Sequence, residues 1–195
     1  MYVVVLLILA IAVIAFSVMR DQRSDDTFLA GARAKGLTPP TAESPLPDGF
    51  SHIYAQSSKH VPQRGSLHFP RSLPIVHGVI EGWETVIWGI EYNSKEPDHA
   101  GYGIRLGTSF AALCKPSRRL PKFSFDAKQQ IVENIGQDTF RKSAIQTLRE
   151  LSSREWSVQS DGQWLLFECR LRSNAGLFSL QLFAELANSI KTERA

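Results

Sequence analysis

Cysteine is scarce in this chain, since Cys114 and Cys169 are the only two among 195 residues. Two cysteines so far apart exclude a disulfide-dense secreted scaffold and a CxxC redox or zinc motif. A large excess of one charge is also absent, because the formal net charge is only +3 at pH 7. Such a mild balance does not indicate a nucleic-acid-binding protein, so no nucleic acid is expected as a partner.

Motifs for nucleotide binding and hydrolysis are missing as well. No GxxxxGK[ST] segment occurs, and the glycines of Gly101-Tyr-Gly-Ile-Arg-Leu-Gly107 have neither nucleotide-binding spacing. Ser109 lies in a GTSFA segment rather than in the GxSxG of a nucleophile elbow. Because no HExxH or paired HxH segment occurs, neither a metal nor a cofactor is expected. The chain is therefore predicted to have no catalytic activity of its own.

A long apolar run opens the sequence. The only polar member of Tyr2–Met19 is Ser17, and an 18-residue helix is about 27 Å long, close to the roughly 30 Å of a bilayer's hydrocarbon core. We therefore predict a transmembrane helix over residues 1–19. A cleaved signal peptide is the alternative, but no basic residue precedes the run.

Residues 20–48 connect this run to the rest of the chain. They are predicted to form a juxtamembrane helix, capped by Asp25 or Asp26 and ended by Gly36, and then an extended proline-rich spacer. The spacer is indicated by Pro39, Pro40, Pro45 and Pro47. Basic residues flank the apolar run only on its C-terminal side, so the domain that follows is predicted to be cytoplasmic. They are Arg20, Arg23, Arg33 and Lys35.

Residues 49–195 are predicted to form an α+β domain whose mostly antiparallel sheet contains hairpins and is packed by two or more helices. Alternating apolar residues predict strands at 75–80, 85–92, 102–114, 123–125, 156–160 and 163–171. Glu81-Gly82 and Asp161-Gly162 mark hairpin turns, the second of type I′. Apolar residues at helical spacing predict helices from Asp138 to Leu151 and over residues 177–191. Residues 50–72 show no regular pattern.

Two apolar positions are candidates for contact with a protein partner or a second copy of the chain. Trp83 lies on the opposite strand face from Val86 and Trp88, so its side chain is predicted to be exposed at a contact surface. The final helix is apolar beyond a single stripe, and the excess at Leu182 makes this residue a second candidate for such a contact. Packing of that helix between the sheet and another helix explains the same residues and is the preferred interpretation.

The densest basic cluster consists of Lys115, Arg118, Arg119 and Lys122. Each basic residue near an anionic leaflet contributes about 1 kcal/mol, so Arg118, Arg119 and Lys122 are candidates for binding anionic lipid. A solvated loop is the alternative.

Two further hypotheses assign chemistry to polar residues. The loop that holds Asp98 and His99 is a candidate for a dispersed active site, together with Glu91 or Arg105. Cys114 is followed by basic residues that would suit a nucleophile, but no catalytic histidine can be matched to it, so a cysteine packed as a small apolar residue is the preferred interpretation.

Three segments carry a family resemblance. They are Phe28–Gly36, Val76–Tyr92, and Leu120–Phe125 followed by the Trp156–Arg170 hairpin. Together they resemble a loose class of bacterial single-pass membrane-anchored proteins of unknown function. The resemblance implies a bacterial inner-membrane protein with an α+β domain, and it transfers no catalytic residue. The resemblance leaves the function open, and it is the tether, the spacer and the absence of catalytic motifs that predict an interaction or scaffold module.

Overall fold

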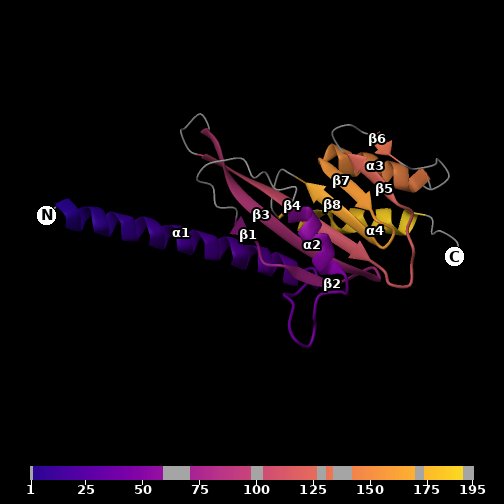
Figure 1. Cartoon of the computed structure of the whole chain (residues 1–195), viewed down its shortest axis with the longest axis horizontal. Helices are drawn as coiled ribbons and strands as arrows, with labels where there is room; N and C mark the ends of the chain where they lie inside the picture. The colour runs from indigo at the N-terminus through magenta and orange to yellow at the C-terminus, as the bar shows by residue number, and fades with distance from the viewer. Residues whose placement is uncertain are drawn as a thin grey trace.

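The protein has an α+β fold in which one antiparallel sheet carries helices on both faces (Figure 1). The computed structural model describes residues 2–58, 71–97, 103–126, 131–133, 142–169 and 174–190. Eight strands within these ranges form the sheet, in the order β1-β3-β4-β8-β7-β5-β6 with β2 also paired to β3. The predicted fold class and antiparallel sheet are confirmed.

Two long strands, β3 (Trp83–Pro97) and β4 (Gly103–Cys114), form the longest pairing of the sheet. The predicted strands are present, although β1 and β6 were not predicted because two or three residues cannot display an alternating pattern. The other strands are β1 (Arg71–Ser72), β2 (Val76–Ile80), β5 (Phe123–Asp126), β6 (Ile131–Glu133), β7 (Trp156–Ser160) and β8 (Trp164–Cys169).

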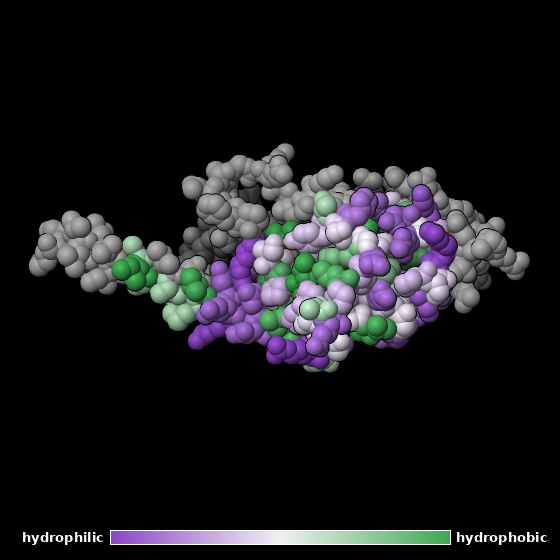
Figure 2. All heavy atoms as spheres, turned by 60° about the horizontal axis from the view of Figure 1, so that its bottom comes forward, coloured by the Kyte–Doolittle hydropathy of each residue, from purple (hydrophilic) through white to green (hydrophobic). Residues whose placement is uncertain are grey.

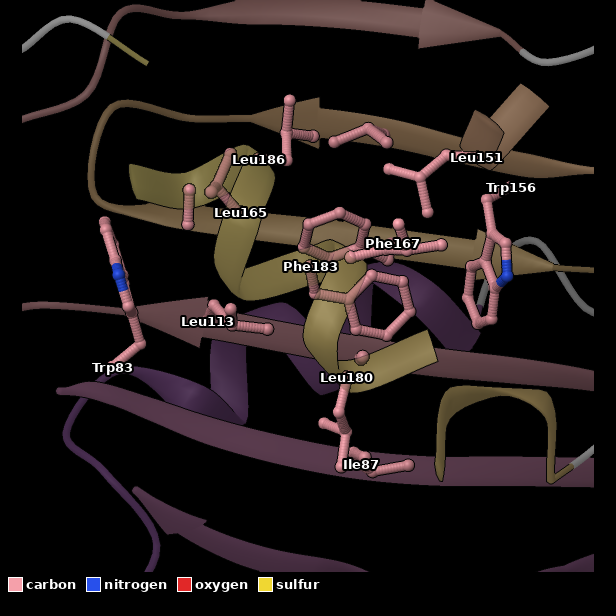
Figure 3. Packing of buried hydrophobic residues seen from close by; sticks show 14 of the residues in the cluster. Trp83, Ile87, Leu113, Leu151, Trp156, Leu165, Phe167, Leu180, Phe183 and Leu186 are labelled. Atoms are coloured by element: carbon pink, nitrogen blue, oxygen red, sulfur yellow. The ribbon is translucent and has the colours of Figure 1, made fainter. Parts of the chain in front are cut away.

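The larger core lies between one face of the sheet and the two helices α3 (Lys142–Ser153) and α4 (Ala175–Ser189). Phe183 of α4 occupies the middle of this core (Figure 3). Its ring centroid lies 4.2 Å from that of Phe167, in a stacked arrangement, and 4.8 Å from that of Trp156, edge to face. Each large apolar side chain buried in this way contributes about 1.5–3 kcal/mol, so this layer carries most of the domain's stability.

The opposite face of the sheet is covered by α2 (Phe50–Ser58), a helix within the segment for which the sequence showed no pattern. Phe50 packs edge-on against Trp88, with ring centroids 5.1 Å apart, and Trp88 stacks on Phe110 at 5.3 Å. The middle of β3 is therefore buried on both sides.

The two hairpin turns close in different ways. Glu81 and Gly82 both have positive φ, at 48° and 78°, which agrees with the predicted two-residue turn between β2 and β3. In the β7–β8 turn only Gly162 has a positive φ, so the predicted type I′ turn at Asp161-Gly162 is wrong. The Asp161 carboxylate instead accepts hydrogen bonds from the backbone N–H groups of Gln163 and Trp164, both at 2.8 Å. The Asp161 side chain thus supplies hydrogen bonds to the turn in the way that a backbone carbonyl would.

Helix α1 (Tyr2–Arg33) is a single helix, so the predicted start of a second helix at Asp25 or Asp26 is wrong. No glycine or proline lies between Met19 and Asp26, and nothing therefore interrupts the backbone hydrogen bonds there. The predicted end at Gly36 is confirmed. Gly36 has a positive φ of 76°. Its N–H donates to the carbonyl of Arg33 at 3.0 Å, and the N–H of Leu37 donates to the carbonyl of Ala32 at 3.0 Å. This pair of hydrogen bonds is a Schellman motif.

The first half of α1 extends away from the sheet (Figure 1), and apolar side chains on it are exposed (Figure 2). Leu9, Ile11, Val18 and Met19 are each more than half exposed, at 51–57%. Among the residues that the structure describes, no helix has both the length and the hydropathy needed to cross a membrane.

The proline-rich segment after α1 forms no helix or longer strand, as predicted. Its ends are nevertheless attached to the domain. Thr38 pairs with His77 of β2 through two backbone hydrogen bonds of 2.8 and 2.9 Å, and Leu46 packs against the α2 side of the sheet. The expectation of a spacer is therefore corrected, because this segment links two packed parts of one domain.

Candidate functional site

An ion-pair cluster holds α1 to the edge of the sheet. This cluster, the α1 clamp, consists of Asp21, Ser24, Asp25, Arg71 and Glu91. Nη1 of Arg71 lies 3.3 Å from Oδ1 of Asp21 and 3.2 Å from Oε2 of Glu91. Nη2 lies 2.5 Å from Oδ1 of Asp25 and donates to the backbone carbonyl of Asp21 at 2.7 Å. The Ser24 hydroxyl donates to Oε1 of Glu91 at 3.5 Å, so one guanidinium joins two turns of α1 to β3.

The members of the α1 clamp differ in how much water reaches them. The side chains of Asp21 and Asp25 are 39% and 34% exposed, so solvent screens their pairs with Arg71, and each such pair is worth less than about 1 kcal/mol. The Glu91 side chain is only 10% exposed. Its pairing with Arg71 matters most, because removing the guanidinium would leave a buried carboxylate without that counter-charge.

Apolar packing continues the attachment toward the end of α1. Phe28 and Ala32 are buried against the sheet and α4. A Cβ on Gly31 would lie 3.4 Å from Cδ1 of Leu177, so α1 passes close to the start of α4. A Cβ on Gly78 would lie only 2.7 Å from the carbonyl oxygen of Gly36, so β2 needs a glycine where the end of α1 crosses it. The second half of α1 is therefore part of the folded domain.

Sequence reasoning missed the α1 clamp because Arg71 lies in the segment without a regular pattern. The available signal was Glu91, which follows Ile87 and Gly89 on the inward face of a strand. A carboxylate on such a face requires a partner, since burying an unpaired charge is costly. That requirement would have pointed to a basic residue on a neighbouring element, although not to Arg71 in particular.

Trp83 is fully buried, with 0% of its surface exposed, so its predicted exposure at a contact surface is wrong. It does lie on the opposite strand face from Val86 and Trp88, but α4 covers that face. Its Nε1 donates to Oδ1 of Asn188 at 2.9 Å. The prediction assumed that one face of the sheet is exposed to solvent, and it failed because helices cover both faces.

Leu182 is buried between the sheet and the helices, so the packing alternative holds for this residue and the prediction of an exposed contact is wrong. The exposed apolar residue of α4 is Phe178, which is 75% exposed. It shares the outer side of α4 with the exposed residues Gln181 and Glu185.

The basic loop, residues Lys115–Lys122, divides into structural and exposed residues. The Arg118 guanidinium lies 5.2 Å from the centroid of the Trp83 ring and donates to the carbonyl of Ile190 at the end of α4. Lys115 Nζ lies 5.9 Å from the same ring. Arg118 therefore has a structural role in the contact between the basic loop, Trp83 and the end of α4, whereas Arg119 and Lys122 are exposed.

The basic loop and the α1 clamp lie at opposite ends of the sheet. The loop follows Cys114, whose register partner is Glu84, and Glu84 precedes Glu91 by seven residues (91 − 84), or about 23 Å of strand. This distance exceeds the Debye length of about 8 Å at physiological salt. Arg119 and Lys122 are therefore electrostatically separate from the α1 clamp, and the anionic-lipid hypothesis stays a prediction.

The two cysteines lie on opposite faces of the sheet, and both side chains are buried. Burial and the nearby Glu84 carboxylate raise the pKa of the Cys114 thiol to about 12. Its Sγ donates to Oε2 of Glu84 at 3.5 Å. A thiol that stays protonated at pH 7 is a poor nucleophile, so the nucleophile hypothesis is wrong and the packed alternative holds.

Asp98 and His99 lie outside the described residues, and of their suggested partners Glu91 is paired with Arg71. Within the described ranges, no group of three or more histidine, cysteine, aspartate or glutamate side chains is arranged to hold a metal ion. No protein-family model, curated protein or solved structure matches this chain. The resemblance to bacterial membrane-anchored proteins therefore stays a prediction.

Proposed function

We propose that this chain is a single-pass bacterial inner-membrane protein whose cytoplasmic α+β domain is an interaction or scaffold module. The observation that carries the proposal is the division of α1 into two halves. The first half has exposed apolar side chains at Leu9, Ile11, Val18 and Met19, and the second half is packed into the domain. Moving the exposed apolar surface from water into lipid is favourable by about 25 cal/mol per Å².

The proposal includes a rigid connection between the membrane segment and the domain. Asp21, the first residue of the α1 clamp, follows Met19, the last residue of the apolar run, by only two positions (21 − 19). Two residues correspond to about 3 Å of helix. A domain held in this way has a fixed orientation to the bilayer, which suits a module that presents one surface to a partner.

The surface we assign to that partner is the outer side of α4 around Phe178. An exposed aromatic residue among polar neighbours is typical of a protein contact, because it offers a large apolar area with few rotatable bonds. Gln181 and Glu185 supply the polar surroundings on the same side of the helix. A protein partner or a second copy of the chain fits this surface.

Extraction of bacterial membranes with alkaline carbonate tests the anchor. The full-length chain is expected to stay in the membrane pellet, and a variant carrying both Leu9→Arg and Ile11→Arg is expected to appear in the supernatant. Each arginine near the centre of a transmembrane helix costs about 2.5–3.5 kcal/mol of insertion free energy. Val79→Arg is the matched control, because Val79 is an exposed apolar residue of the domain, and this variant is expected to stay in the pellet. Release of the wild-type chain by carbonate would refute the anchor.

The orientation is tested separately with two C-terminal fusions, one to alkaline phosphatase and one to a fluorescent protein that matures only in the cytoplasm. Fluorescence without phosphatase activity is expected, because the basic flank of the apolar run lies on the domain side. Phosphatase activity would overturn the cytoplasmic placement while leaving the anchor intact.

A further inference from the structure

We propose that one end of the β3–β4 pair rests on the headgroup region of the bilayer that holds α1. This proximal end consists of Tyr92–Pro97 of β3 and Gly103–Leu106 of β4. The inference rests on the proposed membrane anchor, and it adds a second point of contact between the domain and the lipid.

Two contacts define how α1 is aligned with β3. Ser24 contacts Glu91, and the end of α1 at Gly36 lies against Gly78, whose register partner in β3 is Thr85. The two contacts are twelve residues apart on the helix (36 − 24), or about 18 Å, and six residues apart on the strand (91 − 85), or about 20 Å. Because the two lengths nearly match, α1 runs in the direction opposite to β3 over this stretch, along the part of the sheet where β1 and β2 pair with β3.

The strands of the β3–β4 pair extend well beyond the α1 clamp. β3 continues from Glu91 to Pro97, six more residues (97 − 91) or about 20 Å, toward the side from which the first half of α1 projects. The apolar run of α1 ends at Met19, five residues before Ser24 (24 − 19), or about 8 Å of helix. The proximal end is therefore long enough to reach the level at which the apolar run ends.

The two strands change their pairing and direction near the end of β3. The register of the β3–β4 pair is regular to Asn93–Arg105 and then shifts before Pro97–Gly103. Figure 1 shows β3 and β4 diverging from α1 on the side of its N-terminal half. The proximal end would thus meet the membrane surface beside the helix.

The residue types of the proximal end suit a headgroup region. Its sequence includes Tyr92 and two basic residues, Lys95 and Arg105, against one acidic residue, Glu96. Tyrosine is enriched at membrane interfaces, and lysine is attracted to anionic headgroups at short range. The rigid attachment through Arg71 would hold this surface at the lipid without a separate binding event.

Site-directed spin labelling of the full-length chain in liposomes tests the inference. Nitroxides are attached to Ser94→Cys in the proximal end, to Ser72→Cys in β1, and to Ser117→Cys in the basic loop as the matched distal control. Cys114 and Cys169 are buried, so the wild-type chain is the blank for labelling. The bilayer contains a lipid whose headgroup chelates nickel, and the readout is the relaxation of each nitroxide by the surface-bound nickel.

Relaxation is expected to be several-fold stronger at Ser94 than at Ser117, with Ser72 between them. Distances along β3 are counted from Glu84, which pairs with Cys114 at the start of the basic loop. Ser94 lies ten residues (94 − 84), or about 33 Å, from Glu84. Ser72 pairs with Ile90, which lies six residues (90 − 84), or about 20 Å, from Glu84. Ser72 is exposed, so the contrast between Ser72 and Ser117 still decides the question if the Ser94 variant fails to fold.

A label at Ile11→Cys separates this inference from the anchor itself. A label at Ile11 in the hydrocarbon, combined with equal relaxation at the proximal and distal positions, would overturn the inference and leave the anchor standing. That result would leave the proximal end free for a protein partner. A label at Ile11 in water would refute the anchor and the inference together.

Discussion

Replacement of Trp83 by alanine is expected to destabilise the folded domain by about 4 kcal/mol, within the range of 3–5 kcal/mol for truncation of a buried tryptophan. The ring is fully buried beneath α4, and the Arg118 guanidinium lies over its face. Removing the indole loses this apolar burial, the cation–π contact and the hydrogen bond to Asn188. A domain of this size has only about 5–15 kcal/mol of stability, so the variant should unfold at much lower denaturant concentration.

The assay is urea denaturation of the full-length chain in mild detergent, followed by far-UV circular dichroism. Two companion variants divide the effect. Trp83→Phe keeps an aromatic ring and is expected to lose less than half as much as the alanine variant, whereas Asn188→Ala leaves the indole N–H buried without its acceptor and is expected to lose about 1–3 kcal/mol. A loss of less than about 1 kcal/mol for Trp83→Ala would refute the assignment of this residue to the core. Retained stability together with loss of a crosslinked partner would restore its role as a contact residue.

Three other predictions follow from local geometry. Gly78→Ala is expected to lower the melting temperature, because the new Cβ would press on the backbone carbonyl of Gly36; the cost is about 1–3 kcal/mol. Gly31→Ala is its control, because there the Cβ makes an ordinary contact, and equal melting temperatures for the two variants would contradict this reasoning. Burial raises the pKa of the Cys114 thiol from 9.0 to about 12, so the protonated thiol stabilises the folded state fully below pH 9, and this contribution is lost as the pH rises toward 12. The stability of the wild-type chain should therefore fall more steeply between pH 9 and pH 12 than that of Cys114→Ala. Parallel pH profiles for the two proteins would be inconsistent with the buried thiol. Phe178→Ser is expected to change stability by less than about 0.5 kcal/mol while weakening capture of a crosslinked partner, and unchanged capture would exclude the α4 surface.

Local patterns in the sequence were sufficient for most elements of the sheet. The β2–β3 and β7–β8 hairpins were predicted because their strands alternate and a glycine marks each turn. Helix α4 was predicted from apolar residues spaced by three and four. Gly36 predicted the end of α1 correctly, since a residue with positive φ is needed at that position.

The sequence patterns could not predict which faces of the sheet are covered by helices. Alternation shows that Trp83 and Trp88 lie on opposite faces, but it does not show whether each face is covered. The helix that covers Trp88 begins at Phe50 and is nine residues long, too short for its apolar spacing to stand out. The α1 clamp was missed for a similar reason, because the pairing of Arg71 with Glu91 depends on the sheet register and not on local sequence.

The placement of the two thiols bears on how this chain would tolerate a change of compartment. Cys114 and Cys169 are buried on opposite sides of the same sheet, so one chain cannot join them without opening its own strands. Oxidising surroundings would therefore offer this fold no internal crosslink, and reducing surroundings would take none away. The native sheet would be equally compatible with either side of a membrane, so correct folding of the domain carries no information about its topology.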